Sequence, residues 1–463
     1  MSSILKHLFS LLHQKPKSLY HLKQIHALFI TTDLKSPSIL AKLIEHYFIL
    51  SPHHTPRHAH LIVNHESDCQ VFLLNTLIKC SLPKNSILLF AKWVSVSSIV
   101  FDDHTFIFGL GACARSCSQS ALYEGKQMHG RAVKLGFMSD LLVSTTTIHL
   151  YASKDHIYLA RKVFDEMPLR SNVSWNALIT GYSSQKHNSY ENSLKALETF
   201  KNMLIDDSNL NPNGVTMVSV LSAVSQLGSA EIGSSVHGYV AKTIDILEKD
   251  VYVGTSLIDM YLKCGCLGIA SKVFGTMKER NVLTWTAMAT GYALHGKGKE
   301  AMELVEEMRK CNVRPNLVTL TGMLSACCHA GLVKEGLNLF HCMEKEFGVA
   351  PQIEHYGCIV DLLGKAGHLK EAYDFIVGTH TKLNPVLWRS LLGSCRLHGD
   401  VVMGEKIGMI LLQLQPDRNT LTEDYVALSN VYALAKRWED VGTIRGEMRF
   451  KGLEIKAGRS FVH

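Results

Sequence analysis

The sequence lacks the features that would mark a membrane-bound or disordered protein. Charged residues make up only 19% and apolar residues 46% of the 463 positions, and 48 basic against 41 acidic side chains give a formal charge of +7. A disordered chain needs low hydrophobicity and high net charge, so this composition predicts a folded protein. No apolar run reaches the roughly 18 residues of a membrane span, because the most apolar stretch, 71–101, is interrupted by Lys79, Pro83, Lys84 and Lys92. We therefore expect a soluble protein with no membrane partner.

The motifs of a catalytic or metal site are also missing. A nucleobase deaminase needs H-x-E followed by P-C-x-x-C, where the metal activates water and the glutamate moves protons, and no C-x-x-C occurs here. Nor is there a Walker loop or a G-x-S-x-G elbow. The twelve cysteines are dispersed and follow no secretory segment, which predicts reduced thiols. We expect a protein that is not an enzyme and that holds no metal or cofactor.

Acidic residues are absent from the beginning of the chain. The first is Asp33, and the basic residues before it lie among leucine, serine and histidine: Lys6, Lys15, Lys17 and Lys23. This composition is typical of an organellar transit segment, which we expect within 1–36. The alternative is an ordinary basic first helix, because no arginine precedes Arg57 and the sequence from Tyr20 onward fits the fold.

Short strings recur along the chain. QIHALFI around His26, QMHGRAVK around His129 and SVHGYVAK around His237 are 103 and 108 residues apart. In a second set, Tyr151 in IHLYASK and Tyr182 in NALITGY each recur after 110 residues. These two tyrosines are 31 residues apart, so the long period contains units of about 31 to 42 residues, as in solenoid proteins.

Apolar residues within one unit, 282–316, follow helical spacing. Trp285, Met288, Ala289 and Tyr292 fall at i, i+3, i+4 and i+7, which predicts an amphipathic helix. HGKGK at 295–299 is the expected turn before a second helix of the same kind. Neither helix can bury its apolar face alone, so neighbouring pairs must stack, and we expect an all-α fold.

Cysteines and histidines that recur in phase with the repeat are expected to pack in its interior. Cys113, Cys327 and Cys395 occupy matching helix positions, which favours core thiols over metal ligands. The same argument favours packing over catalysis for the three recurring histidines.

These strings resemble the pentatricopeptide repeat family, specifically the plant class that alternates canonical, long and short repeats. The signatures are NALI, SLIDMY and LSAC, and the resemblance covers nearly the whole chain. After residue 384, PVLWRSLLGSCRLHGD and the sequence from DYVALSNVYALAKRWEDV to AGRSF resemble the two extension motifs of the editing-factor, or E, subgroup. The matching positions there are Trp388, Cys395, His398, Tyr425, Asn430, Tyr432 and Trp438. The resemblance implies a right-handed superhelical solenoid of helix-turn-helix repeats, with the architecture of tetratricopeptide repeats.

The resemblance also implies where the units begin and end. A possible transit segment merges into a degenerate first repeat at 1–36, and extension motifs fill 385–463. The array 37–384 consists of units at 37–70, 71–102, 103–140, 141–171, 172–213, 214–250, 251–281, 282–316, 317–352 and 353–384. The unit from 172 departs from the pattern, with about seven extra residues around 187–192.

Repeats of this kind read about one base of single-stranded RNA per unit with two or three side chains. The resemblance assigns base reading to the fifth and last residues of a unit: Asn75 with Asp102, Thr145 with Ser171, Asn176 with Asn213, Thr255 with Asn281, and Thr286 with Asn316. Apolar second residues are expected to stack between bases: Phe72, Leu142, Val173, Tyr252 and Leu283. The long units carry Ile107, Val218 and Thr321 at the fifth position and are expected to act as spacers or weak readers.

In the family's pattern Asn with Asp implies uracil, Asn with Asn a pyrimidine, and Thr with Asn adenine. From 5′ to 3′ the predicted site is U, any base, an unassigned base, C or U, any base, A, A and two undetermined bases. The alternative for each pair is local, because such residues at helix starts are commonly N-caps or turn residues. Lys263 and Lys365 share one phase of two short units and either touch phosphate or lie on a solvated face.

The implied function is site recognition for C-to-U editing of an organellar transcript. The sequence stops after the extension motifs, without the deaminase domain ending in Asp-Tyr-Trp that some relatives carry. A cytidine deaminase of that type is therefore expected in trans, docked on 385–463 together with small organellar editing-factor proteins. The alternatives are a factor for RNA stability, splicing or translation, and a protein-binding scaffold like the tetratricopeptide repeats, although their W-x-x-L-G-x-x-Y phase is absent. The expected location is the mitochondrion, with the chloroplast as the alternative.

Overall fold

The computed structural model describes residues 3–16, 18–32, 36–50, 57–65, 70–94, 101–206, 210–243, 250–379, 383–414 and 418–453. In these ranges the protein is helical and contains no β-strand, which confirms the all-α prediction. No helix of the described chain is both long and apolar enough to cross a bilayer. The AGRSF ending lies outside the described residues.

The chain divides into two compact units, 1–227 and 228–463. The first contains α1 (Ser3–His13), α2 (Leu19–Thr31), α3 (Pro37–Leu50), α4 (Arg57–His65), α5 (Gln70–Cys80), α6 (Pro83–Val94), α7 (Asp103–Arg115), α8 (Ala121–Lys134), the 3-10 turn η1 (Phe137–Ser139), α9 (Leu141–Ser153), α10 (Ile157–Glu166), α11 (Asn172–Ser183), α12 (Ser189–Ile205) and α13 (Gly214–Leu227).

The second unit contains thirteen helices within its described residues: α14 (Ala230–Thr243), α15 (Val251–Lys263), α16 (Leu267–Thr276), α17 (Val282–Leu294), α18 (Gly298–Lys310), α19 (Leu317–Ala330), α20 (Val333–Phe347), α21 (Ile353–Lys365), α22 (Leu369–Gly378), α23 (Pro385–His398), α24 (Val401–Gln413), α25 (Arg418–Leu434) and α26 (Trp438–Phe450).

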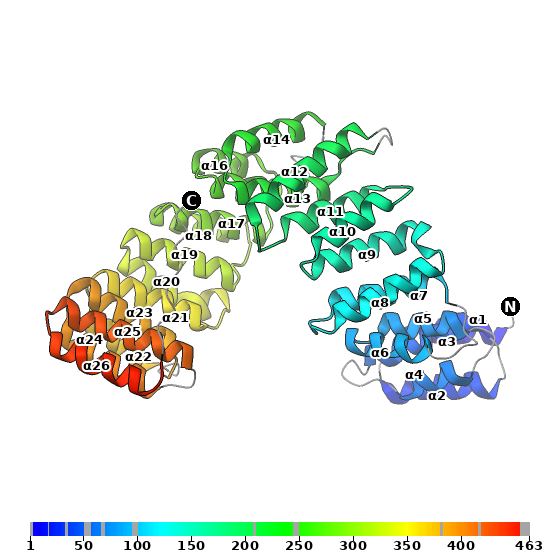
Figure 1. Ribbon diagram of the computed structural model, residues 1–463, viewed down its shortest axis with the longest axis horizontal. Coiled ribbons are helices and arrows are strands. Elements are labelled where there is room, and N and C mark those ends of the chain that lie inside the picture. The colour runs from blue at the N-terminus through cyan, green and yellow to red at the C-terminus, as the bar shows by residue number, and fades with distance from the viewer. Residues whose placement is uncertain are drawn as a thin grey trace. The chain divides into compact units, whose positions relative to one another are not determined.

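Each unit is a stack of helix hairpins (Figure 1). In the first unit α5, α7, α9, α11 and α13 pack side by side in chain order, and in the second unit α15, α17, α19, α21, α23 and α25 do the same. We call these the first helices. The second helix of a hairpin packs against its own first helix, as α18 does against α17. A linear series of equivalent first helices is therefore present in each unit.

The helical spacing of the 282–316 unit predicts its core correctly. Trp285, Met288 and Ala289 are buried in α17, and α18 buries its own apolar face. The turn is shorter than the predicted 295–299, because α18 already begins at Gly298. The seven extra residues of the earlier unit lie around Asn188 and in the first turns of α12, which runs for 17 residues.

The beginning of the chain belongs to the first compact unit. Leu8 and Leu12 of α1 are fully buried, and α1 packs against α2 and α3. An ordinary basic first helix, the alternative to a transit segment, predicts such burial. Where each repeat begins and ends stays a prediction from the sequence.

Candidate nucleic-acid interface

The second residues of the first helices form an exposed apolar series. Phe72, Leu142, Val173, Tyr252 and Leu283 are between 51% and 66% exposed, although the residue that follows each of them is buried. Three residues at the same phase were not predicted: Val215, Val318 and Val386, which are also exposed. The sequence signal was available, because each is the second residue of a predicted unit or of the extension. Exposed apolar side chains spaced one per hairpin can stack on unpaired bases.

Two of the predicted pairs are joined directly by hydrogen bonds. The Asn75 amide nitrogen donates to Asp102 at 2.8 Å and 3.0 Å, and the Asn176 amide nitrogen donates to Asn213 Oδ1 at 3.2 Å. Both asparagines are largely buried, at 5% and 7% exposure, whereas Asp102 is half-buried and Asn213 is exposed. The Oδ1 atom of Asn75 is buried and accepts no hydrogen bond within the described protein.

Two further pairs are linked through a threonine that the sequence analysis missed. Thr255 Oγ1 lies 2.8 Å from Thr284 Oγ1, which donates to Asn281 Oδ1 at 3.1 Å. Thr286 Oγ1 lies 2.6 Å from Thr319 Oγ1, which donates to Asn316 Oδ1 at 2.9 Å. The two side chains of each of these predicted pairs thus converge on one buried hydroxyl.

The fifth pair is not joined. Among the described residues, Thr145 and Ser171 share no hydrogen bond: the Thr145 hydroxyl donates to the Leu141 carbonyl at 2.7 Å, and Ser171 forms a capping box with Ser174. This geometry leaves the unit from 141 without the link that the other four pairs have.

The last residue of every predicted pair also caps a first helix, as the local alternative states. Asp102, Ser171, Asn281 and Asn316 are N-caps of α7, α11, α17 and α19, and Thr216 N donates to Asn213 Oδ1 at 3.1 Å. In the asparagines, the capping atom differs from the atom that could contact a base. Since the cap occupies Oδ1 of each asparagine, its Nδ2 remains to donate outward.

An arginine fixes the backbone just before two of these caps. The Arg170 guanidinium lies 4.8 Å from the Phe164 ring and 5.7 Å from the Trp175 ring, and Arg280 lies 4.3 Å and 5.6 Å from Phe274 and Trp285. Such cation–π packing holds the turn that leads into the next first helix. The neighbouring residues, Ser171 and Asn281, are thereby positioned by packing on both sides.

The two in-phase lysines carry partly neutralised charges. Lys263 Nζ lies 2.7 Å from Asp259 Oδ2, and Lys365 Nζ lies 2.9 Å from Asp361 Oδ2, in each case one helical turn apart. Hydrogen bonding to Asp361 raises the pKa of Lys365, so this side chain is a cation at neutral pH. About half of each lysine side chain is exposed, so phosphate contact and a solvated face both remain compatible with the geometry.

The recurring cysteines and histidines pack inside the units. Cys113, Cys327 and Cys395 are fully buried, as predicted. His129 Nδ1 lies 2.8 Å from the Tyr151 hydroxyl, and equivalent contacts join His26 to Tyr47 at 3.0 Å and His237 to Tyr261 at 2.9 Å. The three pairs connect α8 to α9, α2 to α3 and α14 to α15, so each joins two consecutive helices, which is a packing role.

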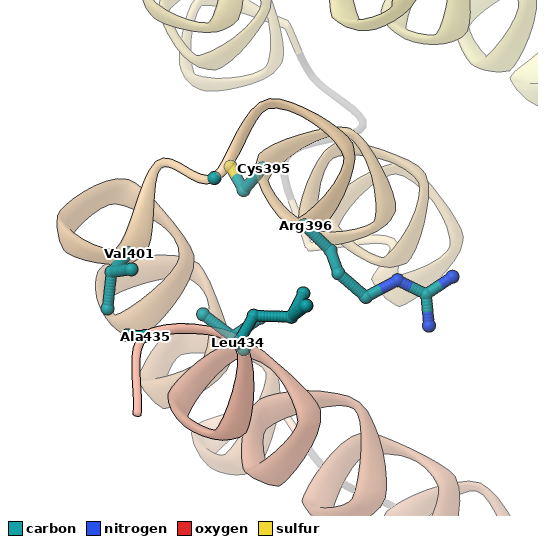
Figure 2. Close-up of a pocket in the computed structure, with 7 residues that line it drawn as sticks. Cys395, Arg396, Val401, Leu434 and Ala435 are labelled. Atoms are coloured by element: carbon teal, nitrogen blue, oxygen red, sulfur yellow. The ribbon is translucent and has the colours of Figure 1, made fainter. Parts of the chain in front are cut away.

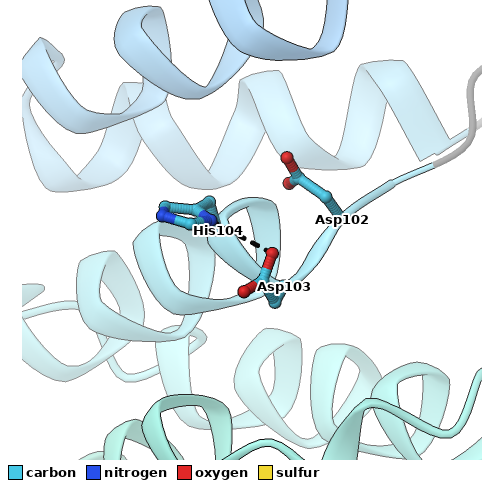
Figure 3. A group of neighbouring side chains, drawn as sticks. All are labelled: Asp102, Asp103 and His104. Atoms are coloured by element: carbon cyan, nitrogen blue, oxygen red, sulfur yellow. Dashed lines mark hydrogen bonds and ion pairs between the residues drawn. The ribbon is translucent and has the colours of Figure 1, made fainter.

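One acidic cluster adjoins a predicted reader. Asp102, Asp103 and His104 bring three potential ligand atoms within 4.8 Å of one another (Figure 3). The Asp102 carboxylate already accepts hydrogen bonds from Asn75 and from Thr105, and His104 Nδ1 lies 3.0 Å from Asp103 Oδ1. These contacts account for the closeness of the three side chains.

The extension region presents an apolar surface at the turns of its two hairpins. Leu397 and Val402 flank the turn between α23 and α24, while Leu434 and Trp438 flank the turn between α25 and α26, and all four are exposed. A small pocket between these turns is lined by Cys395, Arg396, Gly399, Val401, Val431, Leu434 and Ala435 (Figure 2). We call these four residues and the pocket the extension surface. Exposed apolar groups gathered beside a pocket are typical of protein contact sites.

Comparison with known families gives matches in the second half of the chain. The PPR repeat family matches residues 280–329, the PPR repeat matches 255–282 and 318–346, and the E motif matches 398–463. The E motif match lies within the predicted extension, 385–463.

Curated relatives match over nearly the full length. A pentatricopeptide repeat-containing protein of Arabidopsis thaliana is 47% identical over 98% of this chain and 98% of the relative. A second Arabidopsis protein of this kind, named as chloroplastic/mitochondrial, is 38% identical over 95% of this chain and 70% of its own length. A third, the chloroplastic protein CRR2, is 37% identical over 78% of this chain and 54% of its own length.

Solved structures show the same fold at low identity. The pentatricopeptide repeat protein PPR10 from maize matches 94% of this chain with a TM-score of 0.58 and 14% identity. PPR10 in complex with an 18-nt psaJ RNA element matches 91% with a TM-score of 0.55 and 15% identity. This chain spans just under two thirds of those solved chains, 66% and 65%.

Proposed function

The chain belongs to the pentatricopeptide repeat family, and from this premise we propose that it binds single-stranded RNA sequence-specifically and selects a site for C-to-U editing in an organellar transcript. The observation that carries the proposal is the pairing of fifth and last residues beside exposed apolar second residues. In four pairs these polar side chains meet directly or through one hydroxyl. The complex of PPR10 with RNA supports RNA as the ligand.

The hydrogen-bonding capacity of the pairs supports the bases that the family pattern assigns. Asn316 uses Oδ1 for its cap and can donate from Nδ2, while Thr286 donates its proton within the protein and can accept. Adenine offers the matching acceptor, N1, and the matching donor, its exocyclic amino group. Asp102 carries only acceptors and suits the N3–H of uracil.

The proposed target therefore reads U, any base, an unassigned base, C or U, any base, A and A. The test uses purified protein and RNAs that carry these bases or single replacements, with dissociation constants measured by fluorescence anisotropy. Replacing either adenine should weaken binding about fivefold, the effect of one net hydrogen bond of roughly 1 kcal/mol. Equal affinity for all of these RNAs contradicts the proposal.

A recoding variant makes the test specific to the pairs. Thr255→Asn with Thr286→Asn replaces both adenine readers by the asparagine found in the pyrimidine reader Asn176. We expect weaker binding to the A, A site and a gain for pyrimidines at those two places. Thr290→Asn, on the exposed side of α17, is the matched control and should leave the preference unchanged.

Editing, rather than another step of RNA metabolism, is favoured by the E motif and the extension surface. We propose that the extension surface docks a protein with a cytidine deaminase domain, with small editing-factor proteins as further partners, because exposed apolar side chains beside a pocket suit a protein contact. Leu434→Asp with Trp438→Ser should abolish this association while RNA affinity is retained. Gly446→Ser, on α26 with open space around it, is the control.

Sequencing of organellar RNA from a plant that lacks the gene separates editing from its rivals. Loss of editing at one or a few cytidines, with transcript ends and introns intact, is the expected result. Altered ends or retained introns with normal editing would instead favour a role in RNA stability or splicing. Relatives named chloroplastic or mitochondrial support an organellar location, and we favour the mitochondrion.

A further inference from the structure

A third, buried side chain lies next to each predicted base-reading pair. It is the third residue of the next predicted unit: Thr105, Ser174, Thr216, Thr284 and Thr319 follow the five pairs in order. All five are 0% exposed, so none can touch RNA. All five hydrogen-bond to the last residue of the preceding pair, and three of them, Thr216, Thr284 and Thr319, also hydrogen-bond to its fifth residue. A polar group at such a site, buried and bonded to both readers, can govern how the readers present their atoms.

The polarity of this third residue follows the polarity of the preceding fifth residue. Polar fifth residues are followed by polar third residues in Asn75/Thr105, Thr145/Ser174, Asn176/Thr216, Thr255/Thr284, Thr286/Thr319 and Thr321/His355. Fifth residues without a polar side chain are followed by apolar ones in Ala41/Leu73, Ile107/Val143, Val218/Val253 and Gly357/Leu387. A residue needed only to cap its own helix would have no reason to follow the preceding unit.

Thr216 shows how the third residue can orient the two side chains of a pair. Its hydroxyl donates to Asn176 Oδ1 at 2.6 Å, and the Asn176 amide nitrogen donates to Asn213 Oδ1 at 3.2 Å. The amide of Asn176 is thereby held with its oxygen inward, and only an N–H remains to face a base. Asn213 likewise retains only its amide nitrogen, because its Oδ1 accepts from the Thr216 backbone N–H and from the Asn176 amide nitrogen. Two outward donors match the acceptors O2 and N3 of cytosine.

We propose that the third residue of the following unit is a specificity-determining position, which fixes whether the reading pair offers donors or acceptors to its base. This inference rests on the proposed RNA-reading function. The residue acts as a positioning residue, since it touches the readers and not the nucleotide. Without the Thr216 hydroxyl, the Asn176 amide can flip. Its oxygen then faces the base and can accept a hydrogen bond from the exocyclic amino group of adenine.

The test compares four RNAs that differ only at the fourth base of the proposed site. Thr216→Val keeps the shape of the side chain and removes the hydroxyl, while Thr216→Ser keeps the hydroxyl. We expect the preference for C or U over A to fall about fivefold in Thr216→Val, the effect of one hydrogen bond, and to be retained in Thr216→Ser. Preferences at the two adenine sites should not change.

A matched control separates base selection from the loss of a buried hydroxyl. Thr199 in α12 is 1% exposed and its hydroxyl donates to the Lys195 carbonyl at 2.7 Å, so Thr199→Val removes a comparable group away from the readers. This variant should keep the preference at the fourth base. Thr319→Val with Thr319→Ser repeats the test at the second adenine, should Thr216→Val fail to fold.

The outcomes distinguish the inference from the proposed function. An unchanged base preference in Thr216→Val, or a uniform loss of affinity for all four RNAs, overturns the inference and leaves RNA reading intact. A wild-type protein that binds the four RNAs equally at every tested position overturns the proposed function itself.

Discussion

Arg389 and Asp424 form a two-pronged ion pair between α23 and α25. Nε lies 2.6 Å from Oδ1 and Nη2 lies 3.0 Å from Oδ2, and the Asp424 side chain is only 1% exposed. Arg389 is the fifth residue of α23, so in the extension region an ion pair connects neighbouring first helices at the place where hydroxyls and amides do so in the repeats.

Loss of the Arg389 guanidinium should therefore loosen the extension region. Arg389→Met leaves a buried carboxylate without this partner, and we expect a destabilisation of about 3 kcal/mol. Hydrogen exchange of the α23 and α25 amides measures it. The double variant with Asp424→Leu should be less destabilised than Arg389→Met alone. Arg161→Met, which breaks an exposed pair with Asp165, should cost no more than about 0.5 kcal/mol, and an equal loss there would contradict this account.

Acidification should weaken the helix contacts made by the recurring histidines. Burial lowers the pKa of His26, His129 and His237 below the ordinary 6.5, so the folded protein favours neutral imidazole. The unfolded chain takes up these protons first, and stability present above pH 6.5 is lost as the pH falls below it. Thermal unfolding at pH 7.5 and pH 5.5 measures the loss in a range where carboxylates, with pKa values of about 4, stay ionised.

The chain supplies its own control for the histidine contacts. Phe340 and Leu363 occupy, in the last long and short units, the places of His237 and Tyr261. His237→Phe with Tyr261→Leu should fold and should lose less stability on acidification than the wild type. The same pH dependence in both proteins would assign the effect to other groups.

Close packing between hairpins predicts opposite effects for two glycine substitutions. A Cβ at Gly298 would lie 2.6 Å from Ala330 Cβ and 3.0 Å from the Ala326 carbonyl, neither of which can move aside, so Gly298→Ala should destabilise by about 1–3 kcal/mol. A Cβ at Gly238 meets no atom within 4 Å, and Gly238→Ala should stabilise α14 by up to about 1 kcal/mol. Denaturant unfolding of the two variants gives the comparison, and destabilisation by Gly238→Ala would be inconsistent with the open space around it.

Thiol reactivity should divide the cysteines by burial. Burial raises the pKa of Cys113 and Cys395 to about 12 and that of Cys327 to about 11, so their thiolate forms are scarce at pH 8. Cys117 and Cys311 are exposed. Mass spectrometry after brief treatment with iodoacetamide should find Cys117 and Cys311 modified while Cys113, Cys327 and Cys395 stay unmodified. Rapid labelling of Cys395 in the folded protein would show that the extension opens readily.

The fold was accessible from the sequence because helical spacing and repeat length are local properties. The face formed by Trp285, Met288 and Ala289 follows from spacing alone, and the pairs were found from their phase in the unit. The hydrogen bonds that link the two members of a pair could not be predicted from the sequence. Thr255 and Thr284 are 29 residues apart, and the hydrogen bond between them depends on how two helices pack.

Two parts of the site prediction show where phase was insufficient. Thr145 and Ser171 stand at the right positions but share no hydrogen bond among the described residues, because the Ser174 hydroxyl donates to the Ser171 carbonyl, whereas Thr284 and Thr319 bridge the pairs that precede them. The exposed residues Val215 and Val318 were overlooked because the long units were treated as spacers at every position. The second residue of a long unit is exposed like that of the other units, even though the fifth residue of a long unit does not follow their pattern.

The proposed unit of recognition in this protein is not the unit of sequence. Asn176 and Asn213 belong to one predicted repeat, yet Thr216, which hydrogen-bonds to both, belongs to its successor. An engineer who transplants a repeat between such proteins, cutting at its sequence ends, would leave that threonine behind and transfer a module with an altered preference. Grafts that extend three residues into the following helix would carry both members of the pair together with the threonine that hydrogen-bonds to them.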